Sequence, residues 1–345
     1  MEHVINCRLE ATNVTPETFK EFDWAAKLCH QVFAKMATEA GMPKLIEIIL
    51  AEDFDKMVIE RMRKNKEYEK QFTSERPFGH VAAKNLVQDD LHEHIVIVFN
   101  ASDWCREMSC TGNGKLLQLA LIAHELAHPF LARMRQASGA AIGVVYPSIT
   151  PSESARSLSR IIIDEYYADF LADLIVCQLC TKTVNGESSP AHVWDVLGQP
   201  SLESLKHHIS DAATVFPGHV NNYRTRQIPL EDMWGKVLTA TEHLFTMYIH
   251  ARALADATGE KIPILDSPEI KALPFVQKHI PESTYNFLNK FREHNPLLSV
   301  NNWREMENDV VPAGEIAFRE IWQRLGLTFA EAGDQRPFRI NVSTF

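Results

Sequence analysis

Two histidines four residues apart lie inside one long apolar segment, and this pair constrains the chain more than any other feature. The segment, residues 117–134, reads LQLALIAHELAHPFLARM, which is typical of a buried helix. A helix places residues four apart on one face, so His124 and His128 project toward one point and can hold a zinc ion. Glu125 can then act as the general base on a water molecule. The other interpretation is a buried helix whose two histidines have other polar partners.

A catalytic zinc site needs a third ligand, which a second apolar segment offers. Residues 157–179 carry carboxylates at every fourth position, Glu165, Asp169 and Asp173. Buried carboxylates are costly unless they pair with a cation or a metal. We therefore expect Glu165 to bind the metal, Asp169 to accept a hydrogen bond from a ligand histidine, and Asp173 to face solvent. The alternative is an amphipathic helix whose acidic residues form a solvated face.

Together, HELAH and the later EYYAD resemble the signature of the gluzincin metallopeptidases. This group has an HExxH…ExxAD pattern and includes the CAAX prenyl endopeptidases, the ImmA/IrrE regulators and the Lit phage-exclusion protease. The resemblance implies that His124, His128 and Glu165 bind one Zn2+ per chain and that Glu125 is the catalytic base. It also implies a zincin-like metallopeptidase core. The matched motifs span residues 124–169, so most of the chain lies outside them.

A polar segment with the sequence GHVNNYRTRQI is similar to a third element of several gluzincin families, in which a histidine stabilises the transition-state oxyanion. The resemblance assigns this role to His219, followed by Arg224 or Arg226. Zinc-dependent hydrolysis does require a hydrogen-bonding group opposite the metal, and His219 or Tyr223 can supply one. Tyr146 is another candidate. The alternative is a polar surface loop between two helices.

Composition favours a soluble cytoplasmic enzyme, and the resemblance to gluzincins implies a protein or peptide substrate. The chain has 35 basic and 45 acidic residues, a net charge of -10, and no basic tract, so nucleic acid is not an expected direct partner. It has no apolar run long enough to cross a membrane and no signal-peptide core at its start, so no membrane partner is expected. Its oligomeric state is left open.

Six scattered cysteines do not form the spacing pattern of a secreted disulfide framework, so reduced thiols are expected. Cys177 and Cys180 form a CxxC pair. With Cys105 and Cys110 they could complete a four-sulfur zinc site, or they could serve as small hydrophobic residues of an apolar helix.

The order of elements predicts an α+β fold that is mostly helical, with a small N-terminal sheet and a helical C-terminal half. We expect a catalytic core over residues 1–183 and a helical region over residues 184–345 that completes the cleft. Three strands are expected, at residues 3–11, 44–50 and 94–101, and a first helix from Thr15 to Gly41. Further helices are expected at residues 202–213, 230–257 and 313–325.

Three other segments carry functional expectations. The strand at residues 94–101 is expected either at the sheet edge, where it could bind extended peptide, or in the sheet interior. Residues 136–154 form a long connection with Gly and Pro, typical of a lid. Residues 183–200 are the best candidate for a linker.

The sequence thus predicts a zinc-dependent endopeptidase, a metalloprotease that cleaves one or a few specific proteins in regulation or defence. Two alternatives stay open. A non-proteolytic zinc hydrolase would share the metal site but have a closed pocket, and an inactive metalloprotease-like binding module would keep the fold without turnover.

Overall fold

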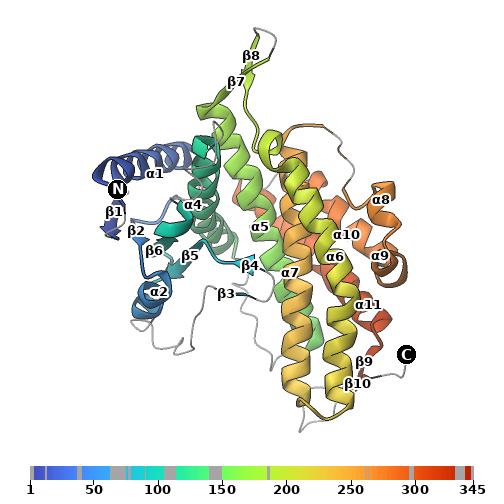
Figure 1. Ribbon diagram of the computed structural model, residues 1–345. Coiled ribbons are helices and arrows are strands. Elements are labelled where there is room, and N and C mark those ends of the chain that lie inside the picture. Colours follow the sequence, from blue (N-terminus) through green and yellow to red (C-terminus); the bar gives the residue numbers. More distant parts are fainter. Residues whose placement is uncertain are drawn as a thin grey trace. The chain divides into compact units, whose positions relative to one another are not determined.

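The chain is mostly helical with a small mixed sheet near its N-terminus, so the predicted α+β class is confirmed (Figure 1). It divides into two compact units, Met1–Ala137 with Tyr167–Val196, and Ser138–Tyr166 with Leu197–Phe345. The predicted domains, residues 1–183 and 184–345, are a different division and stay a prediction. The computed structural model describes residues 4–11, 14–36, 41–62, 75–76, 79–89, 91–104, 114–139, 150–184, 187–260, 262, 264–294, 299–330 and 339–342.

The N-terminal sheet has four strands in the order β1-β2-β6-β5. The strands β1, β2 and β6 are parallel, and β5 runs antiparallel to β6. The three strands expected from the sequence are confirmed as β1, β2 and β6. The bounds are β1 (Val4–Glu10), β2 (Leu45–Ala51), β5 (Ala83–Val87) and β6 (His94–Asn100); a separate short pair consists of β3 (Glu75–Arg76) and β4 (Gly79–His80).

The position of β6 decides between the two expectations for this strand. It lies between β2 and β5, so the edge-strand prediction is wrong and the interior alternative is right. The strand reads HIVIVFN, and its five central residues are all buried, as expected for a strand covered on both faces. Among the described strands, the edges of this sheet are β1 and β5.

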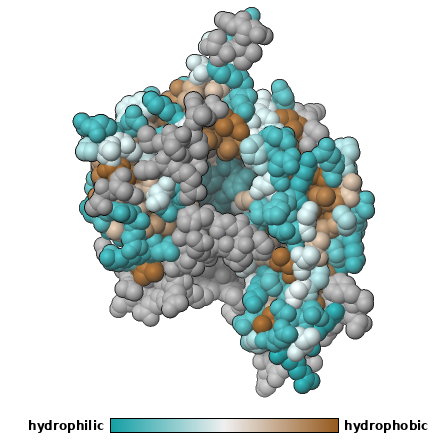
Figure 2. Space-filling model, in the orientation of Figure 1, coloured by the Kyte–Doolittle hydropathy of each residue, from teal (hydrophilic) through white to brown (hydrophobic). Residues whose placement is uncertain are grey.

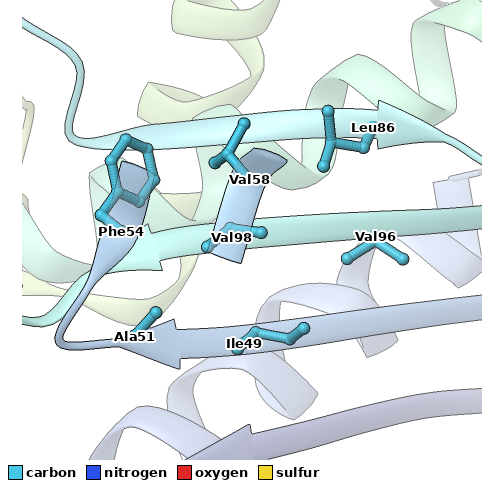
Figure 3. Close-up of a cluster of buried hydrophobic side chains, with 7 residues drawn as sticks. All are labelled: Ile49, Ala51, Phe54, Val58, Leu86, Val96 and Val98. Carbon is cyan, nitrogen blue, oxygen red and sulfur yellow. The ribbon is translucent and has the colours of Figure 1, made fainter. Parts of the chain in front are cut away.

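Helices cover the sheet because successive strand residues point to opposite faces. On one face, α2 (Phe54–Met62) packs on alternate residues of the strands, forming a buried apolar cluster (Figure 3). On α1 (Pro16–Met36), Phe22 meets Phe99 of β6 edge to face, with ring centroids 5.4 Å apart. The cluster in Figure 3 consists of Ile49, Ala51, Phe54, Val58, Leu86, Val96 and Val98.

The two helices that carry the motifs are α4 (Gly114–Ser138) and α5 (Pro151–Leu179), and both are longer than predicted. Thr150 and Glu153 explain where α5 begins. The Glu153 backbone N–H donates to Thr150 Oγ1 at 3.3 Å, and the Thr150 N–H donates to Glu153 Oε2 at 2.9 Å, which is a capping box. The connection predicted at residues 136–154 is therefore too long at both ends. Residues 140–149, which include Tyr146, lie outside the described residues.

The segment predicted as a linker, residues 183–200, has regular structure instead. The strands β7 (Thr181–Val184) and β8 (Glu187–Pro190) form a hairpin that projects from the end of α5 (Figure 1). The next helix, α6 (Trp194–Arg224), already begins before Pro200. The sequence of this segment is rich in Gly, Ser and Pro, which explains why it was predicted to be a linker.

The second unit is a group of helices around an aromatic core. Its longest pair, α6 and α7 (Leu230–Ala257), is joined by a short turn. Trp234 of α7 and Trp322 of α11 pack edge to face at 4.8 Å. The three predicted C-terminal helices are confirmed within α6, α7 and α11. The other elements are α8 (Pro268–Lys271), α9 (Pro274–His279), α10 (Glu282–Glu293), α11 (Val300–Arg324), β9 (Leu327–Ala330) and β10 (Arg339–Val342).

Helix α11 passes unusually close to the first half of α5 at Gly314. A Cβ atom at this position would lie 2.1 Å from the Ser159 hydroxyl and 2.8 Å from the Phe287 ring. Any larger residue at position 314 would therefore force these helices apart.

On the face shown in Figure 2, the coloured surface carries apolar residues in small groups among polar ones. Four large hydrophobic side chains among the described residues are exposed, and they lie far apart in the sequence. Among the described helices, none has the length and apolar character needed to cross a bilayer.

Candidate metal centre

The two motif histidines meet on one face of α4, as their spacing predicts. His124 Nε2 and His128 Nε2 lie 3.2 Å apart, and their rings are nearly perpendicular. Two nitrogens bound to one tetrahedral zinc at ordinary bond lengths would be separated by about 3.4 Å. The pair is therefore spaced as two ligands of a single ion would be.

Asp169 of α5 orients the first of these histidines. The Nδ1 atom of His124 lies 2.7 Å from Asp169 Oδ1, and only 15% and 13% of the two side chains are exposed. A carboxylate accepts a hydrogen bond, so this contact places the ring proton on Nδ1 and directs the unprotonated Nε2 toward His128. The sequence analysis expected this contact of Asp169, and such a carboxylate usually accompanies a metal-bound histidine.

Glu165 completes a three-residue group with the two histidines. It precedes Asp169 by one turn of the continuous helix α5, so both carboxylates lie on one side of it. One ligand atom from each of His124, His128 and Glu165 lies within 4.8 Å of the other two. Two imidazoles and one carboxylate are a donor set that zinc takes in catalytic sites. The residues present therefore fit the predicted ion.

Glu125 is held by a strand residue that the sequence analysis did not single out. The Asn85 side-chain amide donates to Glu125 Oε2 at 2.5 Å and to the Glu125 backbone carbonyl at 3.2 Å. This carbonyl lacks its usual helical partner because Pro129, four residues later, has no N–H. Asn85 thus replaces the missing helical bond and fixes the carboxylate of the predicted base at the same time.

Asn85 belongs to β5, which is an edge strand of the sheet. Among the described strands, the edge strand beside the HExxH helix is therefore β5, and not β6 as one of the sequence-based expectations had it. Its sequence, AKNLV, is too short and too mixed to be recognised as a strand from periodicity.

The structure does not bring His219 and Tyr223 to Glu165. Both lie near the C-terminal end of α6, which extends to Arg224, so the predicted loop is helical over this part. Burial lowers the pKa of His219, and the positive charge of Lys236 on α7 lowers it further. His219 therefore lies beside the part of α7 that contains Lys236. Glu165 lies beside a different part of α7, the part that contains His250.

His250 of α7 lies beside Glu165, and the sequence analysis missed it. Its Nε2 atom lies 3.9 Å from Glu165 Oε2, with 27% and 23% of the side chains exposed. Because a helix rises 1.5 Å per residue, Lys236 and His250 are separated by about 21 Å along α7. His250, and not His219, is therefore the histidine of this helix pair that stands beside Glu165. No motif surrounds it in the sequence.

The third carboxylate of the α5 series does not face solvent as predicted. Asp173 is completely buried, at 0% exposure. It contacts Cys177 and His192, so Cys177 has partners other than the cysteines considered from the sequence. Cys105 and Cys110 lie outside the described residues. Among the described cysteines, Cys7, Cys29, Cys177 and Cys180, none is in a disulfide.

Comparison with known proteins adds no further assignment: no family model, curated protein or solved structure matches this chain.

Proposed function

We propose that this protein is a zinc-dependent endopeptidase of the gluzincin type, with a zincin-like core. The observation that carries the proposal is the convergence of His124, His128 and Glu165, whose ligand atoms lie within 4.8 Å of one another. Asp169 supports it because its contact with His124 sets the tautomer that a metal ligand needs. The HExxH and ExxAD motifs, the likeness to gluzincins and this geometry all point to one metal centre.

Each residue of the centre has a chemical task in this proposal. Zinc, when bound, would supply the Lewis acid that polarises a scissile carbonyl and makes a water molecule more acidic. Glu125 takes the proton of the attacking water and later returns it to the leaving amine. Asn85 keeps the Glu125 carboxylate in place during both transfers, since it donates to that carboxylate at 2.5 Å.

His250 takes the role that the sequence analysis gave to His219. Its ring stands beside Glu165, and an imidazole N–H there can donate to the oxygen that gains negative charge in the transition state. The place of His219 near Lys236 favours His250 for this role. A donor placed before the reaction begins stabilises that charge without reorganisation, which makes it effective.

The open edge of β5 supports a peptide substrate over a small molecule. An extended peptide can add to an exposed strand through backbone hydrogen bonds, and among the described strands β5 pairs with β6 alone. Asn85 lies on this strand, so a peptide bound along it would pass Glu125. We place the enzyme in the cytoplasm, where unrestricted proteolysis would be harmful, and propose one or a few protein substrates in regulation or defence.

The experiment that tests the function compares purified wild type with Glu125→Gln in a native cell extract, with new protein N-termini identified by mass spectrometry. Glutamine keeps the shape of glutamate but cannot accept the proton, so cleavage should fall by at least about two orders of magnitude. Glu305→Gln, an exposed change on α11, is the matched control and should cleave like wild type. Equal cleavage by Glu125→Gln and wild type would contradict the proposal.

A further inference from the structure

A second group of metal-binding side chains lies at the base of the β7–β8 hairpin. Asp173 and Cys177 are one turn apart on α5, and His192 follows β8. His192 Nδ1 lies 2.8 Å from Asp173 Oδ2 and 3.1 Å from Cys177 Sγ. Cys177 Sγ in turn lies 3.4 Å from Asp173 Oδ2. One sulfur, one nitrogen and one oxygen atom thus converge on a single point.

The same ring nitrogen of His192, Nδ1, lies closest to both Asp173 and Cys177. In a catalytic thiol–imidazole–carboxylate relay, the carboxylate and the thiol would contact opposite ring nitrogens of the histidine. Here Asp173 Oδ2 and Cys177 Sγ both approach Nδ1 of His192 most closely, whereas the distance from Sγ to Nε2 is 3.9 Å. This arrangement does not suit proton relay. It suits three donors that face a common ion.

The protein itself holds the Asp173 carboxylate in the orientation that a metal ligand would need. Its side chain is completely buried, and its Oδ1 atom accepts the backbone N–H of Val193 at 2.6 Å. A hydrogen bond to one carboxylate oxygen fixes the direction of the other, as outer partners do for metal ligands. The backbone N–H of His192 donates to Asp195 at 2.9 Å, which holds the loop that carries the imidazole.

We propose that Asp173, Cys177 and His192 bind a second zinc ion, separate from the catalytic one. Cysteine, histidine and aspartate are all zinc ligands, and a sulfur donor disfavours magnesium and calcium. An ion can enter from solvent because 24% of the His192 side chain is exposed. On binding, zinc displaces the thiol proton of Cys177 to solvent, and water completes the coordination.

This ion would tie the hairpin to α5. In the part of the chain that the structure describes, β7 and β8 pair with each other alone, and an isolated two-stranded hairpin is marginally stable in water. Two ligands come from the helix before the hairpin and one from the loop after it, so the ion closes the base of the hairpin. The inference does not rest on the proposed peptidase activity, because none of the three residues belongs to the catalytic group.

Cobalt(II) titration of the full-length, metal-free protein tests this site directly. Cobalt replaces zinc in such sites, and a thiolate ligand adds a charge-transfer absorption in the near ultraviolet that imidazole and carboxylate ligands do not produce. The proposed catalytic group contains no sulfur, so the band distinguishes a cysteine-containing site from the catalytic one, and the variants below identify the cysteine. Wild type should show the band, and added Zn2+ should abolish it.

Three variants identify the ligands. Cys177→Ser should lose the band, whereas the matched control Cys180→Ser, three residues away, should keep it. His192→Gln changes a partly exposed residue with little risk to folding, and it should weaken cobalt binding at least about tenfold. Circular dichroism verifies that each variant is folded. The absence of a band in wild type, or the same band and affinity in all three folded variants, would overturn the assignment. Loss of the band in Cys180→Ser alone would overturn it as well.

Discussion

Asn85 of β5 and Glu125 of α4 are joined by two hydrogen bonds, one to the carboxylate and one to the backbone carbonyl of the same residue. The proline four residues after Glu125 removes the N–H that would otherwise bind that carbonyl. Pro129 therefore leaves the Glu125 carbonyl without a helical N–H donor, and Asn85 of the neighbouring strand supplies a donor instead. This link connects the edge strand of the sheet with the proposed catalytic base.

Replacement of Asn85 by alanine should lower turnover and leave zinc binding intact. A hydrogen bond to a charged group contributes about 1.5–3 kcal/mol, which corresponds to roughly a tenfold to hundredfold loss in kcat. The measurement is kcat on an identified substrate, together with zinc content. Gln88→Ala, just beyond the end of β5, is the control and should behave as wild type. Normal kcat in Asn85→Ala would show that the contact does not support the base.

Asp169→Asn tests whether this carboxylate orients a metal ligand. Asparagine is isosteric but neutral and can present an amide to His124, so the preferred tautomer is lost. Zinc affinity should fall about tenfold to a hundredfold, measured by competition with a chelator. Asp232→Asn, an exposed change in the first turn of α7, should have no effect. Unchanged affinity in Asp169→Asn would assign that residue a purely structural role.

His250 and His219 make a matched pair of substitutions on neighbouring helices. His250→Ala should reduce kcat roughly a hundredfold or more with zinc content retained, because an oxyanion donor is lost. His219→Ala should keep wild-type kcat, since His219 lies near the opposite end of the α6–α7 pair. The reverse result would restore the role predicted from the sequence. Loss of zinc in His250→Ala would instead make His250 a support for Glu165.

The half-buried His243 of α7 should make the fold sensitive to acid. Burial lowers the pKa of His243 to about 4, assisted by the nearby charges of His208 and His250. The unfolded chain binds this proton near the ordinary pKa of about 6.5, so the unfolding free energy should decrease as pH falls from about 6.5 to 4. His243→Gln should reduce this loss, measured by urea denaturation at several pH values. An identical pH dependence in that variant would contradict the assignment.

Local spacing made much of the site predictable. The placement of His124 and His128 on one helical face follows from a separation of four residues, and the carboxylates of α5 repeat at the same interval. Asp169 was expected to contact a histidine, and the structure places it 2.7 Å from His124. The apolar runs that surround these residues also identified both helices and the interior strands.

Residues brought in by tertiary contacts could not be predicted in the same way. Asn85 comes from a short strand without a clear pattern, and His250 lies in the middle of a long helix with no motif around it. Asp173 was expected in solvent because isolated carboxylates are normally exposed. Its partners, His192 and the Val193 N–H, follow the β7–β8 hairpin in the sequence, so the residues around Asp173 do not reveal them. The hairpin segment was predicted to be a linker because its sequence is rich in Gly, Ser and Pro.

The zinc content of purified Glu165→Ala, compared with wild type and Glu125→Gln, tests the central claim most directly. Loss of a third ligand should remove the catalytic ion, whereas Glu125 binds no metal. Elemental analysis should therefore find one zinc per chain fewer in Glu165→Ala than in wild type, with Glu125→Gln equal to wild type. This difference holds whether or not the second site also carries an ion. The same zinc content in folded Glu165→Ala as in wild type would contradict the proposed metal centre.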